Sequence, residues 1–121
     1  MAAVITCTEI GLGTVKKITW AWTCSTDGDG TSTTTGVYDG KVLAVHTIPN
    51  STGAAPTDNY DITVTDADGY DVLLGAAMNR AATAEETIAS TAVGAVASSK
   101  LTFNVAAAGD AKKGTATMWI R

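Results

Sequence analysis

Apolar and polar residues alternate along much of the chain with a period of two, which is typical of half-buried β-strands. The clearest case is residues 60–65, where Tyr, Ile and Val alternate with Asp and Thr. Asp66–Gly69 supplies turn chemistry, and Tyr70–Leu74 is apolar enough to return as a partner strand. We therefore predict a β-hairpin over Asn59–Gly75.

The N-terminal half shows the same alternation in four further segments. We predict strands at Ala3–Glu9 and Val15–Cys24, followed by a loop rich in Asp and Gly. Strands at Thr33–Tyr38 and Lys41–Ile48 follow, and the Asp-Gly pair between them predicts a tight hairpin turn. Within the second strand, one face carries four side chains: Ile18, Trp20, Trp22 and Cys24.

The C-terminal segment predicts a last hairpin. Leu101–Val105 alternates, Ala107–Gly114 has turn composition, and Thr115–Arg121 alternates again. Trp119 falls on the face of this last strand opposite Met118. The pattern does not decide which of the two faces is buried.

Residues 75–99 have no single period. Thr83–Glu86 matches a helix capping box, and a helical face is shared by Ile88, Ala92, Val93 and Val96. Several β-branched residues and the interior Gly94 oppose a helix. We predict a long excursion with at most one short helix.

These segments add up to about seven strands at the roughly 8–12-residue spacing of β-sandwiches and barrels. The predicted fold class is therefore all-β: one antiparallel sandwich or barrel-like domain over residues 1–121. Hydrophobic residues make up 45% of the chain, which is ordinary for a globular domain, and only 17% of residues are charged. The surface must accordingly be rich in Thr, Ser, Asn and Gly.

Charge and segment composition exclude several classes of function. The net charge of -4 argues against a nucleic-acid partner, since phosphate contacts need a basic surface. The first residues lack the basic start and long apolar run of a secretory signal, and nothing approaches the roughly 20 apolar residues of a membrane helix. We expect a cytoplasmic chain without membrane contact. Cys7 and Cys24 are then expected to be reduced and buried, although adjacent strands could bring them together.

Acidic residues are concentrated in the middle of the sequence. Eight aspartates against the single base Lys41 lie between Asp27 and Asp71, whereas bases exceed acids from Arg80 onward. Aspartate favours turns, which is one explanation. The other is an acidic face set against a basic face, which would suit ordered assembly with a partner.

Residues with catalytic or metal-binding chemistry are few. His46 is the only histidine and lies in an apolar strand, and Glu85 and Glu86 are adjacent and would point apart. An EF-hand loop needs an acidic ligand at its twelfth position, and no acidic residue stands there when the loop is counted from Asp27 or from Asp66. We expect no catalytic residue, no cofactor and no metal site, and hence no enzyme.

Aromatic residues are the remaining candidates for contact with a partner. Trp20 and Trp22 share a face with Ile18, which favours core packing over a surface role. Trp119 would be exposed if its face is the outer one, and Tyr38 could serve as an aromatic platform. The candidate partner-contact residues are Trp119, Tyr38, Trp20 and Trp22.

Three runs of sequence resemble small structural proteins of tailed-bacteriophage virions. They are residues 13–22 (GTVKKITWAW), 60–73 (YDITV…DGYDVL) and 100–121 (KLTFNV…AGD…GTATMWIR). Within that group the chain is most similar to capsid decoration, or cement, proteins. It departs from some of those families in lacking an obvious extended N-terminal arm.

The resemblance implies a protein that binds the outer capsid surface and stabilises contacts between major capsid subunits. The implied partners are the major capsid protein and further copies of the chain, with a trimer favoured, and the implied location is the virion after assembly in the host cytoplasm. Two alternatives remain: a tail, neck or baseplate structural protein, and a carbohydrate-binding β-sandwich that uses Trp119 or Tyr38.

Overall fold

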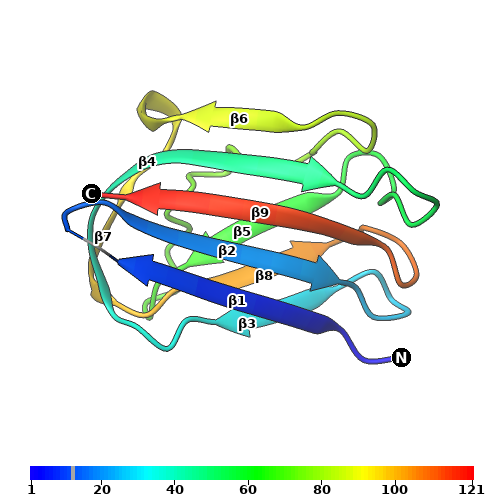
Figure 1. Ribbon diagram of the computed structural model, residues 1–121, viewed down its shortest axis with the longest axis horizontal. Coiled ribbons are helices and arrows are strands. Elements are labelled where there is room, and N and C mark those ends of the chain that lie inside the picture. The colour runs from blue at the N-terminus through cyan, green and yellow to red at the C-terminus, as the bar shows by residue number, and fades with distance from the viewer. Residues whose placement is uncertain (12) are drawn as a thin grey trace.

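Two antiparallel β-sheets face one another in the computed structural model, which describes residues 1–11 and 13–121 (Figure 1). The large sheet has the order β1 (Val4–Gly11), β2 (Lys16–Thr23), β9 (Lys113–Ile120), β4 (Tyr38–Pro49) and β6 (Glu86–Ala89), with β7 (Ala95–Ser99) paired to the start of β4. The small sheet has the order β3 (Gly30–Thr33), β8 (Thr102–Ala106) and β5 (Asp61–Thr65). The all-β prediction is confirmed, and the described residues form nine strands rather than about seven.

Helical structure among the described residues is limited to the 3₁₀ turn η1 (Ser90–Ala92). Within that described part, no helix has the length and apolar character needed to cross a membrane.

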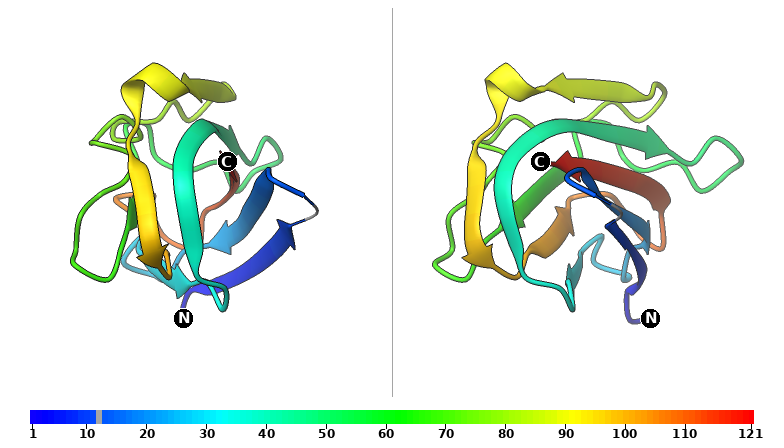
Figure 2. Two further views of the ribbon diagram at one scale, coloured as in Figure 1. Left: turned by 90° about the vertical axis from the view of Figure 1, so that its left-hand side faces the viewer. Right: turned by 60° about the vertical axis from the view of Figure 1, so that its left-hand side comes forward.

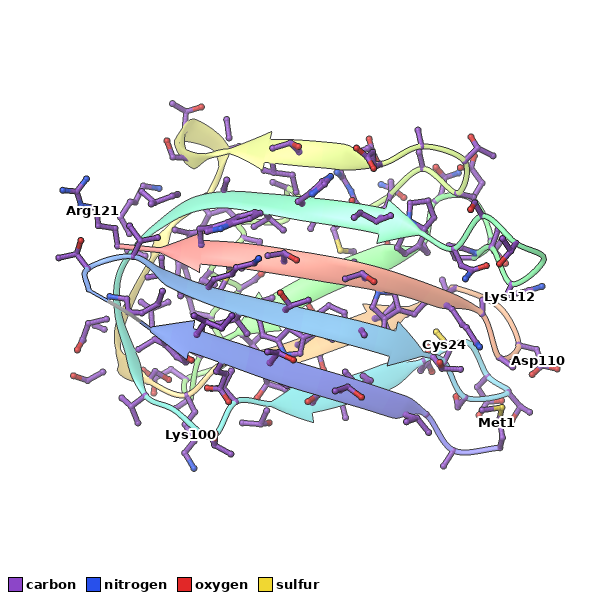
Figure 3. The ribbon with its side chains drawn as sticks, in the orientation of Figure 1. Met1, Cys24, Lys100, Asp110, Lys112 and Arg121 are labelled. Atoms are coloured by element: carbon purple, nitrogen blue, oxygen red, sulfur yellow. The ribbon has the colours of Figure 1, made fainter. Side chains whose placement is uncertain are left out.

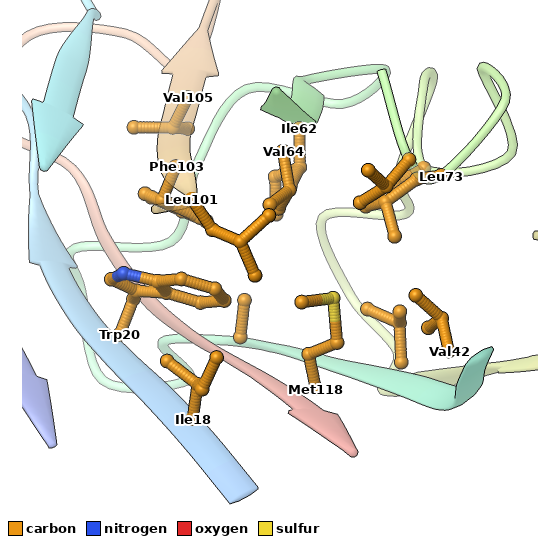
Figure 4. Close-up of a cluster of buried hydrophobic side chains, with 14 of the residues drawn as sticks. Ile18, Trp20, Val42, Ile62, Val64, Leu73, Leu101, Phe103, Val105 and Met118 are labelled. Carbon is orange, nitrogen blue, oxygen red and sulfur yellow. The ribbon is translucent and has the colours of Figure 1, made fainter. Parts of the chain in front are cut away.

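The core fills the space between the two sheets, because each strand turns alternate side chains inward. The Trp20 and Phe103 rings stack with their centroids 5.1 Å apart and so join β2 to β8 (Figure 4). Trp22 packs against Tyr60 at 5.5 Å in the same way. Both tryptophans are at most 2% exposed, so the core interpretation is confirmed and neither can touch a partner.

The predicted strand at Thr33–Tyr38 and the predicted hairpin turn at Asp39-Gly40 are both wrong. The strand in this region is β3, at Gly30–Thr33, which begins within the segment expected to be a loop. β4 runs through this pair without reversing, and the register with β7 shifts there as in a β-bulge. Gly40 has φ +129°, and a Cβ on it would lie 2.0 Å from the Arg121 carbonyl oxygen. Lys41 and Arg121 exchange two main-chain hydrogen bonds of 3.0 Å beside it. The glycine therefore permits a close approach of two chain segments and does not form a turn.

The predicted hairpin over Asn59–Gly75 is only half present. β5 and the turn Asp66–Gly69 form as expected, but residues 70–74 are not a strand and make one isolated bridge, between Thr65 and Asp71. Val72 and Leu73 are both fully buried, which a strand with one solvated face cannot achieve. β5 pairs instead with β8.

Residues 75–99 contain two short strands, β6 and β7, on either side of η1. The capping box does not start a helix: Glu86 begins β6, and its carboxylate accepts a 2.8 Å hydrogen bond from the Ala81 amide. The Lys41 ammonium donates to the carbonyls of Ser90, Val93 and Gly94 and so fastens this excursion to β4.

The predicted C-terminal hairpin is also wrong. β8 belongs to the small sheet and β9 to the large one, so residues 107–112 cross from one sheet to the other (Figure 2). Both strands present an apolar face to the core, one carrying Phe103 and Val105, the other Met118 and Ile120. Packing face to face buries both apolar surfaces, which pairing edge to edge would not do.

The two cysteines are free and are not neighbours. Cys7 lies opposite Trp20 in the β1–β2 register, whereas Cys24 follows the end of β2 and donates its amide to Lys112. Figure 3 shows Cys24 at the end of the sandwich that also carries Met1 and Asp110. Burial raises the pKa of both thiols, that of Cys24 to about 11, and nearby carboxylates (Glu9 and Asp29) add to the effect. Both groups therefore stay protonated at neutral pH.

Candidate partner-binding surface

The outward side of the large sheet is the broadest regular surface of the molecule, and Figure 1 looks onto it. We call it the outer face. It consists of the following side chains, placed by the strand registers: Val4, Thr6, Thr8 and Ile10 from β1; Lys17, Thr19, Ala21 and Thr23 from β2; Lys113, Thr115, Thr117 and Trp119 from β9; Ala44, His46 and Ile48 from β4; Thr87 and Ala89 from β6.

Threonine dominates this face and forms a row across it. Thr8, Thr19, Thr117, His46 and Thr87 occupy successive register positions on neighbouring strands. The hydroxyls of Thr19 and Thr117 are 3.3 Å apart and share a hydrogen bond. A threonine offers a methyl group and one hydroxyl, and it costs less to desolvate than a charged side chain. Thr8 and Thr87 at the two ends of the row are exposed, whereas Thr117 at its centre is only 9% exposed, so a covering protein would meet mainly the outer members of the row.

The outer face carries few charges, and none of its strand positions is acidic. Lys17 and Lys113 lie at opposite ends of it. The His46 Nε2 atom is 3.7 Å from an oxygen of Glu85, at the border with the loop before β6. The face is therefore weakly positive on a chain whose net charge is -4.

Trp119 lies on this face, half-buried, with Lys17 and Ala44 beside it in the register. This answers the question that the sequence pattern left open, because Met118 and Ile120 point into the core. Tyr38, in contrast, is only 8% exposed, and its hydroxyl donates a 2.6 Å hydrogen bond to Glu9. Of the four aromatic candidates, Trp119 alone remains available to a partner.

Glu9 joins β1 to the segment that leads into β4. Its carboxylate accepts hydrogen bonds from the Thr35 amide and hydroxyl at 3.0 and 2.8 Å, and from the Gly36 amide at 3.0 Å, besides the Tyr38 hydroxyl. Burial alone would raise the pKa of Glu9, but these donors outweigh it and lower the pKa to about 2. Burial and the same carboxylate raise the pKa of Tyr38.

Two hollows border the end of the outer face near residues 48–51. One, of about 470 Å³, extends over the ends of β1, β2 and β9 and includes Thr6, Ala21 and Thr115. The other, of about 430 Å³, lies toward Ala82 and Glu85. Both hollows are lined by Ile48–Ser51, so this segment lies between them.

Two of the aspartates compared with an EF-hand loop, Asp66 and Asp71, act as acceptors for backbone amides. Asp66 accepts from the amides of Asp68 and Tyr70, and Asp71 accepts from those of Val64, Leu73 and Gly75. Asp39, Asp58 and Asp61 each accept from a backbone amide as well. Over residues 1–11 and 13–121, no three His, Cys, Asp or Glu side chains gather as a metal site would require. Asp66 shapes a turn, whereas Asp39, Asp58 and Asp61 tie together segments that lie 18 to 59 residues apart in the sequence.

Sequence reasoning found Trp119 but missed the threonine row. The row had a visible signal, the Thr-x-Thr pairs at residues 6–8 and 115–117. These pairs come together only in the strand order β1-β2-β9, which no local sequence pattern predicts.

No protein-family model, curated protein or solved structure shows a significant match to the chain.

Proposed function

We propose that the chain is a virion structural protein, a decoration protein that binds the outer capsid surface and stabilises contacts between major capsid subunits. The observation that supports this best is the outer face: a continuous, threonine-rich surface with few charges across five strands. Exposed Val4, Ile10 and Ile48 add apolar area to it. Its partner would be the major capsid protein, and its location the capsid surface.

This surface suits attachment in many copies because contact with it costs little free energy. Side chains that are small or carry only a hydroxyl lose little conformational entropy on contact and need no charged partner. Many copies of the protein, each bound weakly, can therefore cover a shell closely. Repeated attachment to a symmetric lattice then stabilises it through multivalent binding. Further copies of the chain would take part as a homo-oligomer, for which the resemblance favours a trimer.

Co-sedimentation with capsids that lack the protein tests this proposal. We expect hundreds of bound copies per particle, in a ratio set by the capsid symmetry, and greater resistance of the decorated shell to heat and to loss of salt. Ala21→Glu places a charge at an exposed position of the outer face and should weaken binding about tenfold or more. Thr31→Glu, at an exposed position of β3 on the small sheet, is the matched control.

No co-sedimentation, or equal binding of the two variants, would contradict attachment through the outer face. A few copies per particle would favour a tail, neck or baseplate component. For the carbohydrate-binding alternative only Trp119 remains as a stacking platform, because Tyr38 is buried. A glycan array without hits, or glycan binding unchanged in Trp119→Ala, would remove that alternative.

A further inference from the structure

We propose that two copies of the chain pair through β1, antiparallel and with Cys7 opposite Cys7 of the second copy, so that their large sheets become one continuous sheet. This inference rests on the edge of the sheet and not on the capsid proposal.

β1 is the terminal strand of the large sheet and has eight residues. In an antiparallel ladder, every second residue turns its N–H and C=O away from the neighbouring strand. Apart from the β1–β2 ladder, the main chain of residues 4–11 takes part in none of the hydrogen bonds seen in the described part of the chain. A long edge of this kind is a template for another strand.

The other sheet edges are short or covered. The free side of β5 bonds to the segment that follows it: Ile62 donates to Ala77, and Arg80 and Val72 donate to Tyr60 and Val64. β3 and β6 have four residues each and β7 has five, and β6 is preceded by an exposed glutamate, Glu85. β1 is thus the edge best suited to strand addition.

Charges on an edge strand normally prevent such pairing. Glu9 is the single charged residue of β1, and its carboxylate is held by Thr35, Gly36 and Tyr38. It therefore does not project from the edge as a free charge. β1 also contains no proline and pairs with β2 without a register shift.

The side chains of β1 favour a second copy of the chain as the partner that pairs with this edge. Its outward residues are Val4, Thr6, Thr8 and Ile10, which read apolar, Thr, Thr, apolar in either direction. An antiparallel pair centred on Cys7 sets Thr6 against Thr8 of the second copy and Val4 against Ile10 of the second copy. Thr–Thr and aliphatic pairs are favourable across strands. Val4 and Ile10 are 62% and 49% exposed, and the pairing would cover both.

The arrangement is a two-fold, isologous interface, in which each contact occurs twice. It places both outer faces on the same side of one sheet, so the dimer would present two binding surfaces with a fixed spacing. It also yields a dimer where the resemblance favoured a trimer.

The test uses the purified chain of residues 1–121 and two double variants at exposed positions. Sedimentation equilibrium should give twice the 12.3 kDa chain mass at high concentration. Thr6→Lys/Thr8→Lys sets lysine against lysine and should raise the dimer dissociation constant about tenfold or more. Thr6→Glu/Thr8→Lys sets opposite charges together in the antiparallel register only, and should restore pairing to within about threefold of the wild type.

Thr87→Lys/Ala89→Lys on β6 adds the same two positive charges at exposed positions of the opposite edge of the large sheet and should leave dimerisation unchanged. Far-UV circular dichroism checks that each variant is folded. A monomer at every concentration, a trimer, or equal dissociation constants for the Lys/Lys and Glu/Lys variants would overturn the pairing. None of these results requires capsids, so the proposal fails or stands separately from the proposed function.

Discussion

At the scale of single residues, Glu9 does more for the fold than its place on an edge strand indicates. It accepts four hydrogen bonds from a segment that lies 26 to 29 residues away in the sequence. Sequence reasoning placed Glu9 at the end of a strand but gave it no partner, because contacts over such separations depend on how the strands are ordered. Trp20 and Trp22 were easier to place, since alternation alone puts them on the same face as Ile18.

Glu9→Gln tests this contact. The pKa of Glu9 falls from about 4.5 to about 2 on folding, so its stabilisation is present above pH 4.5 and is lost as the pH falls toward 2. We expect the substitution to lower the free energy of unfolding by about 1–3 kcal/mol at pH 7, measured by urea unfolding. The difference from the wild type should shrink at pH 3. Tyr38→Phe removes one donor and should cost less; an equal difference at both pH values would contradict this account.

At the scale of elements, the alternating pattern located most strands but misjudged their connections. An Asp-Gly pair was interpreted as a hairpin turn at residues 39–40, although Gly40 serves the close approach of Arg121. Turn chemistry and bulge chemistry both require a residue with positive φ, so the local sequence does not separate them. The strands β6 and β7 were missed because each is short and depends on pairing with β4.

Gly40→Ala tests the role of the bulge in β4. The new methyl group would meet the Arg121 carbonyl, so we expect a loss of about 2–4 kcal/mol in the free energy of unfolding. Gly53→Ala is the matched control, because Gly53 also has positive φ but nothing within 4 Å of its Cβ position. Gly53→Ala should lower the free energy of unfolding by about 1 kcal/mol, which is the cost of a positive φ at alanine alone. Equal losses for the two variants would show that the approach of Arg121 is unimportant.

At the scale of the whole molecule, the sequence predicted the fold class and the inward face of β2, but neither the buried face of β9 nor the division of the strands into two sheets. β8 and β9 are consecutive in the sequence, and the alternating pattern could not say that they face each other across the core. The candidate surface depends on that division. Its residues come from five strands, three of which become neighbours only when β9 inserts between β2 and β4.

Binding of the partner to the outer face is tested best by the protection of single cysteines from chemical labelling. In a Cys7→Ser/Cys24→Ser background, Ala21→Cys reports on the outer face and Thr31→Cys on the opposite side, both at exposed positions. Maleimide labelling rates are compared for the free protein and for capsids carrying it. We predict that binding slows labelling at residue 21 about tenfold or more and leaves residue 31 unchanged. Equal rates at residue 21 in both states, or protection at residue 31 alone, would contradict the account.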